Sequence, residues 1–307
     1  MASLYIIIGG FFWGIIGLFS SNLAAAGCSP VEITFLRNLV GALGMLCYLV
    51  FFKRESLKIN MKDLWMFLGT GILSIVFFNI MYFQTISLTT LSVAAILLYT
   101  APCFVMLMSV VFFHEKLTGR KMIALLLAFC GCACTTGILD GFFMQGFSGP
   151  GNLQGAGSFQ SLGILTGIAS GFGYALYSIF GNVALKKYRS ETVTVYTFII
   201  AAVFLAPFCM RPALLEKMRD GYAMVNALAI GLVSTMLPFL FYTAGLKKTE
   251  PGKASVMAFV EPMVATLVGV FILRQPLSLI GGLGIGLIFL SILILNLKGK
   301  REKSMEM

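Results

Sequence analysis

Apolar residues run through this sequence in ten long stretches, each bounded by charged residues, prolines or turn-forming residues. The stretches are close to 20 residues long, and an α-helix of about 20 residues crosses the roughly 30 Å hydrocarbon core of a bilayer. A helix also satisfies its own backbone hydrogen bonds, which lipid cannot do. The pattern predicts an all-α integral membrane protein with transmembrane helices at residues 3–22, 31–52, 64–86, 91–113, 121–139, 162–185, 192–210, 223–246, 254–273 and 278–297.

Composition agrees with this prediction. Of the 307 residues, 59% are hydrophobic and 11% are charged, whereas soluble domains have about 45–50% and about 25%. So few charged side chains cannot cover a surface that faces water. The net charge of +10 would suggest nucleic-acid binding in a soluble protein, so the positions of the charges decide what it means here.

The positive charges are distributed unequally between the two sides of the predicted helices. Most of the 22 lysines and arginines lie in the segments that share a side with the N-terminus, from Lys53 and Arg54 to the basic tail at 298–307. The other side holds Arg211, Lys217, Arg219 and Arg274. Because positive residues accumulate on the cytoplasmic side of membrane proteins, we expect both termini in the cytoplasm, in the plasma membrane. Topology accounts for the charge, and no nucleic-acid partner is expected.

The first apolar stretch is interpreted as a transmembrane helix. No Lys or Arg precedes it, and it is longer than the apolar core of a signal peptide. The seven cysteines form no disulfide framework. In the run of Cys130, Cys132 and Cys134, helical spacing turns Cys132 away from the other two, so we interpret these residues as small wall residues and expect no metal.

Catalytic patterns are missing from the sequence. His114 is the single histidine and lies at the cytoplasmic end of the fourth stretch, so neither a histidine metal cage nor a convincing Ser/His/Asp arrangement can be assembled. A phosphate-binding loop of the Walker type is also absent, so an ATP-driven pump is not expected. We predict that the protein is not an enzyme and needs no cofactor.

An internal repeat organises the chain. Residues 82–117 align without gaps to residues 242–277 at an offset of 160. The identical pairs are Tyr82 and Tyr242, Thr89 and Thr249, Ala94 and Ala254, Pro102 and Pro262, and Leu117 and Leu277. The predicted organisation is a first repeat at 1–140, a Gly/Ser-rich linker at 141–161, a second repeat at 162–297 and the tail. Because each repeat has five helices, the two are inverted relative to each other, which is the symmetry that alternating access requires.

Several short motifs accompany this repeat. They are Phe12-Trp13-Gly14, Ser29-Pro30 through Arg37, Ala101-Pro102, His114-Glu115-Lys116-Leu117 and Val260-Glu261-Pro262. With ten helices in two repeats, the chain resembles the drug/metabolite transporter superfamily, and its EamA-type members in particular. The resemblance implies a metabolite permease, often an exporter of amino acids or related compounds. One departure is Gln275, which stands where the repeat partner is Glu115 and where the family often has Glu.

Glu261 is the leading candidate for a coupling residue. An ionisable group in lipid is costly unless it is paired or hydrated, so such groups are functional candidates. Glu261 lies in the ninth stretch before Pro262, on a face that also carries Ala254, Ala258 and Ala265. Two interpretations stay open: it binds a proton or a substrate amine during transport, or it is a hydrogen-bonded structural residue at a kink.

Arg37, in the second stretch, is the other intramembrane charge. Its guanidinium can bind a substrate carboxylate in a bidentate manner. The alternatives are structural: a pair with Glu32 or Glu261, or a side chain that extends to the membrane interface.

Polar and aromatic residues at helical spacing predict a binding pocket. The candidates are Trp13, Asn79, Tyr82, Tyr99, Tyr174, Tyr177, Ser178 and Tyr242. The alternative for each tyrosine is a place in the interfacial aromatic belt. Pro102 and Pro262 are expected to bend their helices. Glycine pairs four residues apart, at Gly10 and Gly14, at Gly163, Gly167 and Gly171, and at Gly282 and Gly286, predict close helix contacts.

These observations predict a secondary transporter of small organic metabolites that works by alternating access, and the family resemblance implies an exporter of amino acids or related compounds. Proton coupling stays open, and so does the oligomeric state. The expected partners are a small-molecule substrate and membrane lipids. The alternative functions are a drug or quaternary-amine efflux permease, a lipid-carrier flippase and a membrane scaffold without transport activity.

Overall fold

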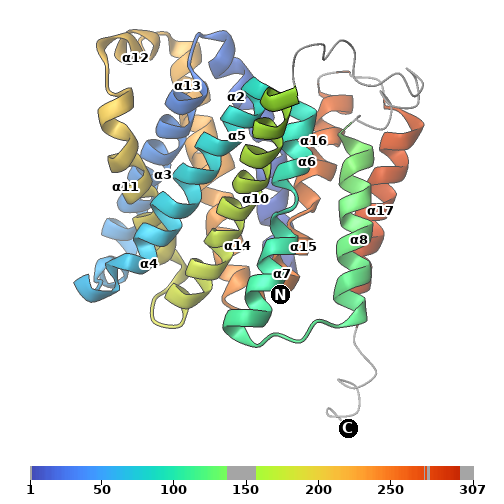
Figure 1. Ribbon diagram of the computed structural model, residues 1–307. Helices are drawn as coiled ribbons and strands as arrows, with labels where there is room; N and C mark the ends of the chain where they lie inside the picture. The colour runs from blue at the N-terminus through green and yellow to red at the C-terminus, as the bar shows by residue number, and fades with distance from the viewer. Residues whose placement is uncertain (1, 137–156, 273, 275–276, 298–307) are drawn as a thin grey trace.

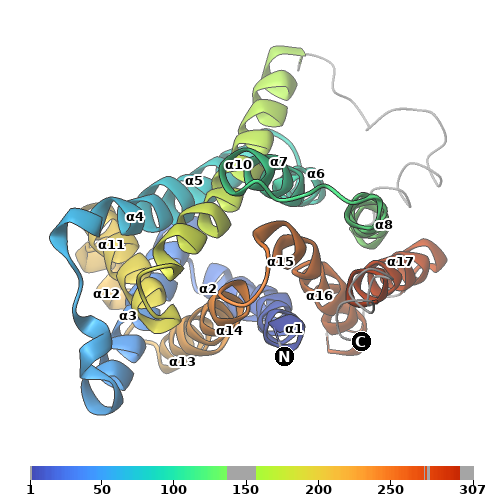
Figure 2. The ribbon, with the colours of Figure 1, turned by 90° about the horizontal axis from the view of Figure 1, so that it is seen from below.

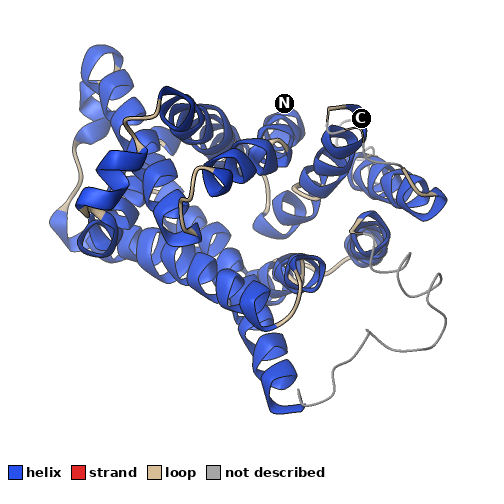
Figure 3. Cartoon of the chain, turned by 90° about the horizontal axis from the view of Figure 1, so that it is seen from above, coloured by secondary structure: helices blue, strands red, loops and turns tan. Residues whose placement is uncertain are grey.

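The computed structural model describes residues 2–136, 157–272, 274 and 277–297. These residues form helices and the connections between them, and no strand occurs among them (Figure 3). Most of the predicted linker, the basic tail at 298–307 and Gln275 lie outside the described residues.

Helices form the first five predicted spans as far as the structure describes them, which is to residue 136. Their elements are α1 (Ala2–Gly14) and α2 (Ile16–Ala25), then α3 (Pro30–Phe52), then α4 (Leu64–Leu68), η3 (Gly69–Val76) and α5 (Phe77–Leu88), then α6 (Leu91–Leu98) and α7 (Ala101–Phe113), and finally α8 (Gly119–Thr135). Two short 3₁₀ turns, η1 (Arg54–Leu57) and η2 (Met61–Asp63), connect α3 to α4.

The second five spans follow the same order. Their elements are α10 (Gly157–Leu185), then α11 (Ser190–Cys209), then α13 (Gly221–Gly231), η4 (Leu232–Met236) and α14 (Leu237–Leu246), then α15 (Pro251–Met257) and α16 (Val260–Phe271), and finally α17 (Leu279–Asn296). A short helix, α12 (Pro212–Lys217), connects α11 to α13.

Length and composition qualify these helices as membrane spans. Among the described residues, nine helical segments are long and apolar enough to cross a bilayer. The tenth span is α8, which has 17 residues and packs along α17. Large apolar side chains on the outside of the bundle, such as Phe51, Val111, Leu165 and Leu279, are more than half exposed. Lipid solvates such side chains, so the chain is a multi-pass membrane protein.

The two repeats are inverted copies. The first repeat begins at the face of the bundle where α1 starts and ends at the opposite face, and the second repeat runs back, so that α17 ends at the first face (Figure 1). We call the face where α1 begins and α17 ends the terminal face. The main contacts join one repeat to the other: α1 packs on α14 and α16, and α10 packs on α5 and α7. Likewise α11 packs on α3, and α17 lies beside α8 (Figure 2).

Irregular backbone occurs at matching positions in the two repeats. The fourth span is interrupted at Tyr99–Thr100 and the ninth at Ala258–Phe259, and Pro102 and Pro262 lie in the first turn of the helices that follow. The third and eighth spans each contain a π-helical segment, η3 and η4, and η4 corresponds to the last five residues of η3 at the offset of 160. Widened turns of this kind are frequent at functional sites and hinges.

The helix ends at the fourth and ninth spans also match. His114 and Arg274, which are 160 residues apart, both adopt left-handed backbone conformations, with φ of 54° and 53°. The amide of Glu115 then donates to the Ser109 carbonyl at 3.2 Å, which closes the end of α7.

Glycines allow the closest helix contacts. A Cβ added at Gly131 would lie 2.7 Å from the Gly284 carbonyl oxygen, so α8 and α17 touch through their backbones. The predicted contacts at Gly10 and Gly14, which pack on α16, are confirmed, as are those at Gly163, Gly167 and Gly171, which pack on α5, α6 and the residues before α7. The prediction for Gly282 and Gly286 is wrong, because an added Cβ at either one meets nothing within 4 Å. Spacing places these two glycines on one face of α17, but none of the described helices covers that face.

Candidate transport site

Five of the predicted residues line one small pocket between the repeats. Trp13 comes from α1, Tyr174, Tyr177 and Ser178 come from α10, and Tyr242 comes from α14. Ile75 of η3 and Phe239 of α14 complete the lining. The two tyrosines and the serine of α10 share a face, because side chains at positions i, i+3 and i+4 of a helix point in similar directions. We call this space the central pocket.

Hydrogen bonds and ring contacts hold the walls of the central pocket. Tyr177 and Thr243 share a hydrogen bond of 2.8 Å between hydroxyls, and so do Ser178 and Tyr242. The Trp13 ring lies edge-on to Phe239 at 5.0 Å, and the Tyr177 ring does so at 4.9 Å. These geometries are favourable for aromatic pairs. The pocket therefore presents aromatic faces, and the hydroxyls of Tyr177, Ser178 and Tyr242 already have partners.

The central pocket is closed around these side chains. Its volume is about 10 Å³, which is room for one water molecule at most. Sites for small organic ligands have about 300–1,000 Å³. Binding a metabolite here requires the helices that carry the walls to separate.

Glu261 lies beside the central pocket, in the first turn of α16 and directly after the break in the ninth span. Gly10 and Gly14 of α1 let the two backbones approach: a Cβ added at Gly14 would lie 2.8 Å from the Glu261 carbonyl oxygen. The Glu261 side chain is partly buried. It interacts electrostatically with Arg37, Tyr82, Tyr99 and Tyr174.

Arg37 connects the two repeats near the same point. Its Nε donates to the Thr235 hydroxyl in η4 at 3.0 Å. Glu32, one of its predicted partners, is instead hydrogen-bonded to Lys217 at 2.9 Å and to the backbone of Ser29. Of the two carboxylates considered, the one that interacts with Arg37 is therefore Glu261.

Three predicted residues lie outside the lining of the central pocket. Asn79 donates to the Ile75 carbonyl at 2.7 Å and so satisfies a backbone oxygen of the π-helical segment. Tyr82 packs against Phe83, and Tyr99 packs against Phe259 at 5.7 Å. Asn79 thus has a structural contact, whereas the two tyrosines form part of the surroundings of Glu261.

Sequence reasoning missed four contributors to this site, namely Ile75, Phe239, Thr235 and Thr243. Phe239 lies three residues before Tyr242 and so on the same helix face, which is a signal that could have identified it. Thr235 and Thr243 are partners of Arg37 and Tyr177, and their roles depend on which helices meet.

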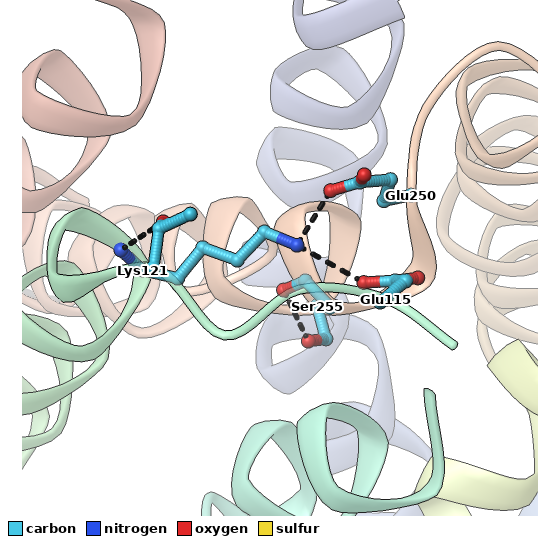
Figure 4. Close-up of polar contacts among 6 residues, drawn as sticks. Glu115, Lys121, Glu250 and Ser255 are labelled. Carbon is cyan, nitrogen blue, oxygen red and sulfur yellow. Dashed lines mark hydrogen bonds and ion pairs between the residues drawn. The ribbon is translucent and has the colours of Figure 1, made fainter. Parts of the chain in front are cut away.

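A second polar site, which the sequence did not indicate, lies at the terminal face. The Lys121 ammonium contacts the carboxylates of Glu115 and Glu250 at 3.2 and 2.5 Å (Figure 4). Burial raises the pKa of Glu115 above its ordinary value, and Lys121 opposes the shift. We call these three residues the Lys121 cluster.

Metal binding has no support in the part of the chain that the structure describes. No group of three His, Cys, Asp or Glu residues there could hold an ion. Cys132 is buried and Cys130 is exposed, in line with their opposite directions on α8.

Comparison with known proteins identifies the family. The model of the EamA-like transporter family matches residues 1–137 and again residues 161–297. The chain belongs to the EamA-like transporter family. Its sequence is 26% identical to an uncharacterized transporter of Archaeoglobus fulgidus over 92% of this chain and 94% of that protein. It is 23% identical to the uncharacterized transporter YwfM of Bacillus subtilis over 99% of this chain and 96% of the relative.

The fold also occurs among solved structures. One crystal structure superimposes with a TM-score of 0.80 at 18% identity and covers 98% of both chains. At this identity the match concerns the fold, which is therefore shared over the full length of the bundle.

Proposed function

We propose that this EamA-family protein is a secondary transporter that moves a small organic metabolite, an amino acid or a related compound, out of the cell. The observation that carries the proposal is the central pocket: both repeats build it, it is closed to about 10 Å³, and the Arg37 and Glu261 charges lie beside it. Transport, and no chemical conversion, is the proposed activity.

The mechanism we infer is alternating access. Because the two repeats are inverted copies, the motion that opens the bundle at one face is related by symmetry to the motion that opens it at the other. The interrupted fourth and ninth spans and the π-helical segments η3 and η4 occur at matching positions, so each repeat has the same places to bend. Pro102 and Pro262 favour such bending because they remove a backbone donor.

We place the terminal face in the cytoplasm. The connections at this face carry Lys53, Arg54, Lys116, Lys187 and Lys248, and the excess of positive charge supports a cytoplasmic position. The plasma membrane is then the site of transport.

Glu261 is proposed as the coupling residue, with Arg37 as its counter-charge. When Glu261 binds a proton or an amine, its attraction for the guanidinium weakens. Arg37 is hydrogen-bonded to Thr235 in η4, so a change at Glu261 can reach the π-helical segment of the eighth span. In this way, substrate binding at Glu261 is connected to bending of the eighth span.

The test is counterflow of zwitterionic amino acids into proteoliposomes, with and without a pH gradient. Wild-type counterflow is expected to accelerate with the gradient, and Glu261→Gln is expected to lose this response. Glu216→Gln serves as control, because Glu216 is an exposed carboxylate in α12. If Glu261→Gln responds to the gradient as the wild type does, Glu261 is not the coupling residue.

A quaternary amine is the second candidate substrate. The rings of Trp13, Tyr174, Tyr177, Phe239 and Tyr242 line the central pocket, and aromatic faces bind quaternary ammonium groups. Counterflow of a tetraalkylammonium ion in the same liposomes decides between the candidates. Flux of neither compound, together with transbilayer movement of a labelled lipid, would instead establish a flippase.

A further inference from the structure

Lys121 is a buried lysine at the base of a large opening in the terminal face. The opening has a volume of about 1280 Å³ and lies between the α7–α8 connection, the end of α10, the α14–α15 connection and the end of α17. We call it the vestibule. Lys121 lies in the first turn of α8 and is 8% exposed. The positive-inside tendency explains exposed lysines at this face, but it does not require a buried one.

The two carboxylate partners of Lys121 differ in how much of each side chain is exposed. The Glu115 side chain is 7% exposed, and it comes from the same repeat as Lys121. The Glu250 side chain is 55% exposed and comes from the second repeat, directly before α15. Figure 4 shows the Lys121 side chain extended, with its ammonium between the two carboxylates. A buried cation needs an anionic partner, while an exposed ion pair contributes little. Glu115 is thus the fixed partner and Glu250 the exchangeable one.

The vestibule attracts anions. Besides Lys121, its lining includes Lys116, Arg120, Lys186, Lys248 and Lys253. Its carboxylates are Glu115 and Glu250, and both already contact Lys121. A concave surface with an excess of one charge concentrates ions of the opposite charge.

We propose that the vestibule is a binding site for the carboxylate of an organic anion or zwitterion, which replaces Glu250 on the Lys121 ammonium. This inference rests on the proposed transport function and adds the chemical class of the substrate. Replacement breaks the ion pair between Lys121 of the first repeat and Glu250 of the second. Because Glu250 directly precedes α15, which leads to Glu261, loading the vestibule frees the start of the ninth span.

The sequence does not repeat the Lys121 cluster at the opposite face. At the offset of 160, Glu250 corresponds to Thr90, Glu115 to Gln275 and Lys121 to Gly281. None of these counterparts carries a charge, so the inverted repeat does not reproduce the Lys121 cluster at the opposite face. The proposed site therefore receives its ligand from the terminal face.

The test measures binding of sodium succinate to the full-length protein in nanodiscs by the shift of thermal unfolding, at constant ionic strength set with sodium chloride. The neutral diamide of succinic acid is the matched probe. Glu250→Gln removes the competing carboxylate, and we expect its Kd for succinate to fall at least about threefold. The double variant Lys121→Met with Glu115→Gln removes the buried pair together, and we expect it to lose the shift. Lys58→Gln, an exposed lysine outside the vestibule lining, should keep the wild-type Kd.

Two results would overturn the proposal. One is a Kd for succinate that is unchanged or higher in Glu250→Gln, and this variant decides the matter even if the double variant does not fold. The other is an equal shift with succinate and its diamide, or an equal shift in the wild type and the double variant. The transport proposal fails separately: it fails if the wild type binds succinate as expected but shows no counterflow of any solute.

Discussion

Charged side chains inside this protein occur in two different settings. Lys121 has two carboxylate partners within hydrogen-bond distance at the terminal face. Glu261 interacts with Arg37 over a longer distance, while Arg37 is hydrogen-bonded to Thr235. A tightly paired charge is stable in one arrangement, whereas a loosely paired one can change partners at lower cost. We therefore place coupling at Glu261. At Lys121 we place ligand exchange at Glu250 alone, because the Glu250 side chain is 55% exposed whereas that of Glu115 is 7% exposed.

Glu115 gives the protein a pH-dependent stability. Because burial raises its pKa, the folded protein binds this proton more tightly than the unfolded chain does. The stabilisation that this proton contributes is complete below the ordinary glutamate pKa of about 4.3. It is lost as the pH rises through the higher pKa that Glu115 has in the folded protein. Thermal unfolding in detergent should show Glu115→Gln gaining stability relative to the wild type as the pH increases from about 4.

The control for this prediction is Glu216→Gln, an exposed carboxylate in α12. Its unfolding curve should stay parallel to that of the wild type over the same pH range. Parallel curves for Glu115→Gln would mean that the Glu115 carboxyl titrates at the same pH in the folded and unfolded chains.

At the scale of the helices, small residues decide which spans can approach most closely. The contact between α8 and α17 depends on Gly131 and Gly284, and the Ser291 hydroxyl donates across it to the Ala124 carbonyl at 2.7 Å. Irregular turns add a second property, since η3 and η4 widen the third and eighth spans next to residues of the candidate site. Close contact fixes some helix pairs, and widened turns let others bend.

Alanine at Gly131 should separate α8 from α17. Its Cβ would lie 2.7 Å from a backbone oxygen that cannot move independently of its helix. We expect a loss of about 1–3 kcal/mol in the free energy of unfolding, as for other overpacked sites. Denaturant titration in mixed micelles measures this loss.

Gly286→Ala is the matched control on α17. A Cβ at Gly286 meets nothing within 4 Å, and alanine is favoured over glycine in a helix interior. This variant should be more stable than the wild type by about 0.5–1 kcal/mol. Equal effects of the two substitutions would show that the α8–α17 contact does not constrain the bundle.

At the scale of the whole molecule, an approximately symmetric bundle carries an asymmetric charge distribution. The repeats match in helix order, breaks, π-helical segments and helix ends, whereas the Lys121 cluster occurs at the terminal face alone among the described residues. In the mechanism that we propose, backbone symmetry lets the bundle open to either face. The charges make the two faces unequal, and in our proposal they determine the face from which a charged ligand arrives.

Orientation in the membrane can be tested directly. In a cysteine-free background, Glu216→Cys at the opposite face should react with a membrane-impermeant maleimide in intact cells. Glu55→Cys, between α3 and α4 at the terminal face, should react only after the cells are permeabilised. Both positions are exposed. The reverse pattern would place the termini outside the cytoplasm and would contradict our orientation of the vestibule.

The sequence by itself determined the spans, the inverted repeat and part of the pocket. Helix length, hydrophobicity and the direction of side chains along one helix are local properties, so Tyr174, Tyr177 and Ser178 could be placed on one face before any contact was known. A repeat with five helices is inverted by geometry alone. These features needed no information about neighbouring helices.

Only the tertiary structure decided which faces meet. In the folded protein, α17 packs against Gly131, whereas Gly286 has no neighbour within 4 Å of an added Cβ. Phe239 lines the central pocket, while Tyr82 and Tyr99 do not, and the pocket has a volume of about 10 Å³. The tertiary structure also joined Lys121 to Glu250, which is far away along the chain. Contacts of this kind depend on the packing of several helices at once, and the pattern along any single helix does not specify that packing.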